Sequence, residues 1–101
     1  MPYHVELTDD ARRQLRGLAA RQRATIADAM SMQLVHQPTV ATRNRKPMEP
    51  NPWGSWELRV GNLRVYYDVM EGSEPTVTVN AMGVKRRNRV FIDGQEIEIR
   101  G

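Results

Sequence analysis

The stretch that most restricts the fold is WELRVGNLRVYYDV, residues 56–69, where apolar and polar side chains alternate on both sides of a Gly-Asn pair. Alternation with a period of two predicts strands with one buried face. Gly61-Asn62 predicts a two-residue hairpin turn, because both positions accept positive φ. The resulting register sets three apolar pairs on one face: Val60 with Leu63, Leu58 with Val65, and Trp56 with Tyr67. A half-buried antiparallel sheet is therefore the expected centre of the fold.

The same register places charged side chains on the opposite face of the hairpin. Arg59 lies directly across from Arg64, and Glu57 lies across from Tyr66. Like charges opposed across two strands destabilise a sheet by roughly a few tenths of a kcal/mol or somewhat more. Such a pair predicts a two-arginine clamp for an anion. The alternative is that Glu57 and Asp68, on the same face, neutralise the two arginines.

Helices and further strands are predicted on both sides of this hairpin. Residues 3–7, YHVEL, alternate as a strand, and Thr8 followed by two aspartates is typical of a helix start. Two apolar stripes with helical spacing follow, and Pro38 ends the second. Their members are Leu7, Ala11, Leu15 and Leu18, then Ile26, Met30 and Leu34. Residues 75–83, PTVTVNAMG, predict another strand, with Val77, Val79 and Ala81 alternating. RVFI and QEIEI, which flank Asp93-Gly94, predict a hairpin that ends at Ile99.

Length and element order together predict the fold class. A chain of 101 residues suits a single domain with one modest core, here residues 1–101. We expect an α+β fold with an N-terminal strand, two antiparallel helices packed on a mainly antiparallel, twisted sheet of about four strands, and a short C-terminal hairpin. The proline-rich residues 38–54 show little periodicity, so we expect a long loop there that binds a ligand or is disordered.

The residues that are missing exclude several classes of protein. The chain has no cysteine, no apolar run long enough to cross a membrane, and no secretory pattern at its start. It also lacks the spacings of zinc sites, phosphate-binding loops and nucleophile elbows. His4 and His36 stand alone, which favours surface or helix-end positions. We therefore expect a soluble cytoplasmic protein with no metal, no other cofactor and no membrane contact.

Three separate segments after the predicted helices carry basic residues close together, and 13 of the 15 basic residues of the chain are arginine. Arginine favours phosphate, because its planar fork of donors matches phosphate oxygens. Gly83 is expected to end its strand and to leave GVKRRNRVF at the sheet edge beside the hairpin. If the loop folds over the same face, all three segments meet in one concavity that attracts a polyanion. The alternative is a solvated surface, with Arg89 opposed by Glu98. The candidates are Arg43, Arg45 and Lys46 in the loop, Arg59 and Arg64 in the hairpin, and Lys85, Arg86, Arg87 and Arg89 with Phe91 near the C-terminus.

The order of these pieces resembles the RelE/ParE superfamily of type II toxins, in particular its RelE and HigB-like members. The resemblance covers nearly the whole chain and is strongest at LRVG and RVYYDV in residues 58–69 and at the glycine and basic residues of 83–87. It implies an endoribonuclease that cuts messenger RNA on the ribosome without a metal and is held inactive by a cognate antitoxin. RNA cleavage by its own 2′-hydroxyl needs a base, an acid, and cations that stabilise the charge on phosphorus.

The resemblance also implies roles for individual residues. Arg64 matches the family's hairpin arginine and would brace the scissile phosphate. Lys85, with Arg86 beside it, falls where the family has a phosphate-contacting or acid-supplying cation. The other candidates named above would bind nucleic acid. Two positions depart from the family pattern: Glu57, where some members carry lysine, and Phe91, where some carry tyrosine. Phe91 can stack on a base but cannot donate a proton, and Glu57 brings negative charge toward a phosphate unless it serves as the base.

Two other functions remain open at this stage. A ParE-like member of the same superfamily would poison DNA gyrase without nuclease activity, because one fold hosts both activities. A third possibility is a catalytically silent module that binds an antitoxin or a nucleic acid.

Overall fold

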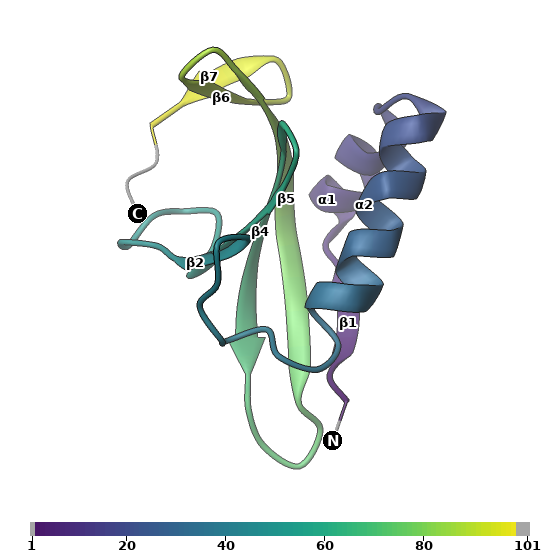
Figure 1. Ribbon diagram of the computed structural model, residues 1–101, viewed down its shortest axis with the longest axis vertical. Coiled ribbons are helices and arrows are strands. Elements are labelled where there is room, and N and C mark those ends of the chain that lie inside the picture. Colours follow the sequence, from purple (N-terminus) through teal and green to yellow (C-terminus); the bar gives the residue numbers. More distant parts are fainter. Residues whose placement is uncertain (1, 99–101) are drawn as a thin grey trace.

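The computed structural model describes residues 2–98 as two helices packed against one face of a curved sheet (Figure 1). The predicted α+β class and the two helices are confirmed. The sheet has seven strands rather than about four, because a short strand inside the loop and both strands of the terminal hairpin join it. The elements are β1 (His4–Leu7), α1 (Asp9–Arg16), α2 (Ala20–Gln33), β2 (Arg45–Pro47), β3 (Trp56–Val60), β4 (Leu63–Met70), β5 (Thr76–Arg86), β6 (Arg89–Ile92) and β7 (Gln95–Ile97).

Strand β5 is the centre of the sheet. The strands lie in the order β2-β3-β4-β5-β6-β7 with antiparallel pairing, and β1 adds to β5 in parallel. Because β4 occupies one edge of β5, β1 and β6 share the other edge and leave a gap at residues 80–83. Side chains fill this gap: Thr8 Oγ1 donates to the carbonyl oxygen of Asn80 at 3.2 Å, and Gln14 Oε1 accepts from the Met82 amide at 2.7 Å.

The register of the β3–β4 hairpin is the predicted one. All five predicted cross-strand pairs are present, including Arg59 opposite Arg64 and Glu57 opposite Tyr66. The turn differs in detail, since Gly61 has a φ of 59° while Asn62 is not among the residues with positive φ. One residue in the left-handed region is enough to reverse the chain at this position.

A bulge in β5 changes the face to which its later side chains point. Tyr66 pairs with Ala81 while Tyr67 pairs with Val79, so Asn80 has no partner across the strands. Val79 belongs to the main core under the helices, whereas Ala81 packs on the other face with Tyr66. The prediction that Val77, Val79 and Ala81 share one alternating face is therefore wrong at Ala81, and Met82 takes the core position instead.

The predicted start of the first helix and the predicted stop of the second are confirmed, but Leu18 and Leu34, predicted in the helical stripes, lie just beyond α1 and α2. Thr8 Oγ1 accepts a hydrogen bond from the Ala11 amide, and two aspartates occupy the first turn of α1. This is the expected N-terminal cap. Helix α2 ends at Gln33, before Pro38. None of the described helices is long and apolar enough to cross a membrane.

Strand β5 continues past Gly83 to Arg86, contrary to the prediction that it ends at Gly83. Arg86 pairs with Arg89, so Arg87 and Asn88 form a two-residue turn and Arg87 takes a φ of 56°. Gly83 allows β6 to pass close by, because a Cβ at this position would lie 2.8 Å from the carbonyl oxygen of Phe91. The basic segment thus forms the turn between β5 and β6. Neither strand is an edge strand, because β4 pairs with β5 and β7 pairs with β6.

The terminal hairpin forms as predicted around Asp93 and Gly94, which have φ values of 55° and 76°. Its predicted end at Ile99 lies outside the described residues. The loop prediction for residues 38–54 is wrong at β2, which pairs with β3 through Lys46 and Glu57. Asn51 holds the remainder of the loop, since its side chain bonds four backbone groups.

Candidate functional site

A cationic pocket lies on the face of the sheet away from the helices. It is a cavity of about 170 Å³, and β2, β3, β4 and β5 each contribute one basic side chain to it. The cross-strand pairs Lys46–Glu57, Arg59–Arg64 and Arg64–Gly83 explain this convergence, because directly paired residues project from the same face. The cationic pocket is lined by Lys46, Met48, Glu57, Arg59, Arg64, Lys85 and Val90.

Glu57 is the buried acid of the cationic pocket. Its side chain is 6% exposed, Arg59 Nε donates to Oε1 at 2.8 Å, and the Tyr66 hydroxyl donates to Oε2 at 3.0 Å. Burial raises the pKa of Tyr66 well above its usual value, and the charge of Glu57 and its hydrogen bond add to the shift. The phenol therefore keeps its proton and fixes the orientation of the carboxylate. One carboxylate faces four cations, so the pocket keeps an excess of positive charge.

Arg64 is held in place by the turn that precedes it. It is only 6% exposed, and its Nη1 donates to the carbonyl oxygens of Gly61 and Leu63, both at 2.8 Å. Within residues 2–98 no buried side-chain nitrogen or oxygen lacks a hydrogen-bond partner. The Nε and Nη2 atoms of Arg64, which make no hydrogen bond to the described residues, therefore reach the solvent of the pocket. The guanidinium is rigid and still has donors to offer to an anion.

Arg45, predicted as a nucleic-acid contact, is buried and does not line the cationic pocket. It is 5% exposed, its Nε donates to the Val40 carbonyl at 2.9 Å, and its Nη1 donates to the Gln33 carbonyl at 3.1 Å and to the Gln33 side-chain oxygen. Arg45 pairs with Leu58 on the helix side of the sheet, and this alternation sends Lys46 into the cationic pocket. Arg43 is exposed and lines neither this pocket nor the larger cavity described below.

The C-terminal basic segment is divided between the two faces of the sheet. Lys85 lines the cationic pocket, but Arg86 and Phe91 line a separate cavity on the helix side. The prediction that Lys85 and Arg86 meet Arg64 in one concavity therefore holds for Lys85 and is wrong for Arg86. Arg87 is exposed in the turn, and Arg89 forms an ion pair at 3.3 Å with Glu96 rather than Glu98.

Sequence reasoning missed the central position of Glu57. The predicted register already put Glu57 beside Arg59 on the polar face, but we read it as a departure from a family pattern and not as the floor of the site. Met48 and Val90, the apolar walls, carry no signal in the sequence, because the loop and the terminal hairpin bring them there. In the described part of the chain no cluster of three histidine, aspartate or glutamate side chains suits a metal ion.

The comparison with solved structures finds a similar fold, whereas the comparisons with family models and curated proteins find no match. No protein-family model and no curated protein matches the chain. Among solved structures, the chain is similar to a chain of the toxin-antitoxin complex RelBE2 from Mycobacterium tuberculosis, with 27% identity and a TM-score of 0.67. The match covers 84% of this chain and 100% of the other. It confirms the predicted resemblance to RelE/ParE-type proteins.

Proposed function

We propose that this chain, a RelE/ParE-type protein by its fold and element order, is the toxin of a type II toxin-antitoxin pair, and that it cleaves messenger RNA on the ribosome. The similar solved chain comes from a toxin-antitoxin complex and is matched over its whole length, which supports the toxin assignment. We propose further that it acts as a single domain in the cytoplasm and that a cognate antitoxin neutralises it.

The observation that carries the nuclease proposal is the cationic pocket with an acid at its floor. Four cations from four adjacent strands surround a cavity of about 170 Å³. The free donors of Arg64 are already oriented, so little reorganisation is needed when charge develops on the phosphate. The buried carboxylate of Glu57 among these cations supports catalysis, because it is a group that can accept a proton there.

Each step of the reaction has a candidate residue in the cationic pocket. Glu57 accepts the proton of the 2′-hydroxyl, whose oxygen attacks the adjacent phosphorus. Arg64 and Arg59 stabilise the negative charge on the non-bridging oxygens. Lys85 donates a proton to the departing 5′-oxygen, so the products are a 2′,3′-cyclic phosphate and a 5′-hydroxyl. Side chains supply all of the positive charge that this scheme requires.

Two exposed cations test the proposal with little risk to folding. Lys85→Ala and Arg59→Ala change exposed side chains of the pocket, whereas Arg21→Ala, on the outward face of α2, serves as the matched control. Purified protein, freed of any partner, is added to a translating extract, and breaks in messenger RNA are mapped. We expect codon-positioned breaks with the wild type and with Arg21→Ala, and about 100-fold fewer with each pocket variant.

A parallel assay separates the nuclease from the gyrase poison. Supercoiled DNA and gyrase are incubated with the same proteins. Intact messenger RNA together with gyrase-dependent DNA cleavage would overturn the nuclease proposal and leave the ParE-like alternative. Intact RNA together with normal gyrase activity would leave only a binding function.

A further inference from the structure

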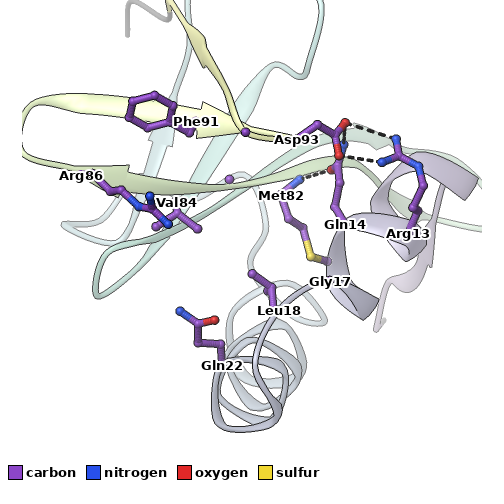
Figure 2. Close-up of a pocket in the computed structure, with 12 residues that line it drawn as sticks. Arg13, Gln14, Gly17, Leu18, Gln22, Met82, Val84, Arg86, Phe91 and Asp93 are labelled. Carbon is purple, nitrogen blue, oxygen red and sulfur yellow. Dashed lines mark hydrogen bonds and ion pairs between the residues drawn. The ribbon is translucent and has the colours of Figure 1, made fainter.

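A cavity larger than the cationic pocket lies on the helix side of the sheet. It has a volume of about 590 Å³ and opens between α1, the turn that follows α1, the end of β5, and β6 (Figure 2). This volume is within the range of about 300–1,000 Å³ found for ligand sites. Leu18, Met82, Val84 and Phe91 supply apolar surface to it. We call this space the helix-side cavity.

An ion-pair network closes one end of the helix-side cavity. Arg13 Nη1 contacts Asp93 Oδ1 at 2.6 Å, and Gln14 Nε2 donates to Asp93 Oδ2 at 3.0 Å (Figure 2). The hydrogen bonds from Arg13 and Gln14 hold the pKa of Asp93 below its usual value. Gln14 also accepts the Met82 amide in the gap of β5. The charges at this end are already paired, so they offer little to a ligand.

Arg86 is the remaining charge of the helix-side cavity. Its side chain is exposed and makes no hydrogen bond or ion pair with any other described residue. Its cross-strand neighbour Arg89 is already paired with Glu96. Figure 2 shows Arg86 and Val84 projecting from β5 on the side that carries Leu18. One unpaired guanidinium thus stands beside an apolar floor.

We propose that the helix-side cavity is a docking site for an acidic, amphipathic segment of the antitoxin, with apolar side chains on Leu18 and Val84 and a carboxylate on Arg86. This inference rests on the proposed function, since it assumes that the chain has an antitoxin. The chemistry favours a protein segment over nucleic acid, because a phosphate backbone needs several cations and this cavity has one to spare. Charge complementarity and an apolar floor are what an amphipathic acidic segment offers.

The site gives the antitoxin a surface other than the catalytic one. The β5–β6 hairpin carries Lys85 and Val90 into the cationic pocket and Arg86 and Phe91 into the helix-side cavity. A segment bound on the helix side therefore contacts the strands that build the pocket without entering the pocket. Inhibition through this contact requires only that the hairpin shift when the segment binds.

A graded charge series at Arg86 tests the inference. The probe is the full-length cognate antitoxin that the proposed function requires, titrated by calorimetry into the wild type, Arg86→Gln and Arg86→Glu. Arg21→Glu, with the same change of charge on the outward face of α2, is the control. We expect Kd to rise about 10-fold for Arg86→Gln and about 100-fold for Arg86→Glu, as for a close interfacial charge pair, with less than about 3-fold for the control. The salt dependence of Kd should fall in the same order.

The outcomes separate this inference from the proposed function. Tight binding of the wild type with equal Kd values for both Arg86 variants would overturn the docking site and leave the toxin assignment intact. Absence of binding to the wild type would overturn both. If Arg86→Glu weakens affinity for a 2′-deoxy RNA analogue instead of affinity for the partner, the cavity binds nucleic acid and the docking proposal is wrong.

Discussion

The substitution Glu57→Gln distinguishes a proton acceptor from a structural counter-ion. Glutamine keeps the shape of the side chain and one acceptor oxygen, but it removes the negative charge and most of the basicity. The side chain of Glu57 is 6% exposed, and among residues 2–98 its oxygens accept hydrogen bonds only from Arg59 and Tyr66. The change is therefore confined to the floor of the cationic pocket.

Glu57→Gln is expected to strengthen the binding of a phosphate and to slow the chemical step. Arg59 is 41% exposed, so its ion pair with Glu57 contributes at most about 1 kcal/mol and the loss of stability stays near that value. Removing one negative charge from the pocket strengthens the attraction for a phosphate by about 1 kcal/mol, or roughly 5-fold in Kd. Loss of a general base lowers the rate of the chemical step by about 100-fold to 10,000-fold.

Single-turnover cleavage on programmed ribosomes measures the rate, and fluorescence anisotropy with a 2′-deoxy analogue measures binding. Glu71→Gln is the matched control, because Glu71 also accepts a tyrosine hydroxyl, from Tyr3 at 2.7 Å, at an exposed site that does not line the pocket. We expect slow cleavage with tighter binding for Glu57→Gln and neither effect for Glu71→Gln. Cleavage by Glu57→Gln within about 3-fold of the wild type would refute the base assignment.

Three further predictions concern groups outside the reaction itself. Tyr66→Phe removes the hydroxyl that orients Glu57, so we expect a loss of about 1–2 kcal/mol in urea unfolding and about 10-fold slower cleavage; unchanged values would mean that the carboxylate needs no support. Arg45→Met removes the hydrogen bonds that hold the loop, so stability should fall by about 2–4 kcal/mol while RNA affinity stays the same, and the reverse pattern would restore Arg45 as a contact. Because Arg13 lowers the pKa of Asp93 in the folded state, that carboxylate adds stability above the unfolded pKa of about 4 and loses it as pH falls through the lower folded value. The difference in melting temperature between the wild type and Asp93→Asn should thus be full at neutral pH and shrink below about pH 4, and a difference that does not depend on pH would contradict it.

The central hairpin could be predicted because local chemistry determines it. Gly61-Asn62 sets the turn, and the alternation from Trp56 to Val69 leaves one register that buries every apolar side chain. The convergence of Arg59 and Arg64 follows directly from that register. The helices could also be predicted from local sequence, because Thr8 marks the start of the first helix and Pro38 limits the second.

The rest depends on interactions between distant parts of the chain. The bulge at Asn80 depends on bonds from its side chain to Trp53 and Asp68, which are far away in sequence, and it moves Ala81 to the other face. The continuation of β5 to Arg86 requires β6 to pair with it. Strand periodicity cannot show that a neighbour will be present, so the face occupied by Arg86 was predicted wrongly.

The sharing of one edge of β5 by β1 and β6 also affects when the cationic pocket can form during synthesis. The first strand of the chain can pair only with residues 76–79, and Lys85, the last cation of the pocket, is added later still. Closing such a long loop costs chain entropy, and strand pairing cannot offset this cost until both β1 and β5 have been synthesised. A nascent chain shorter than this lacks Lys85 and therefore has no complete cationic pocket.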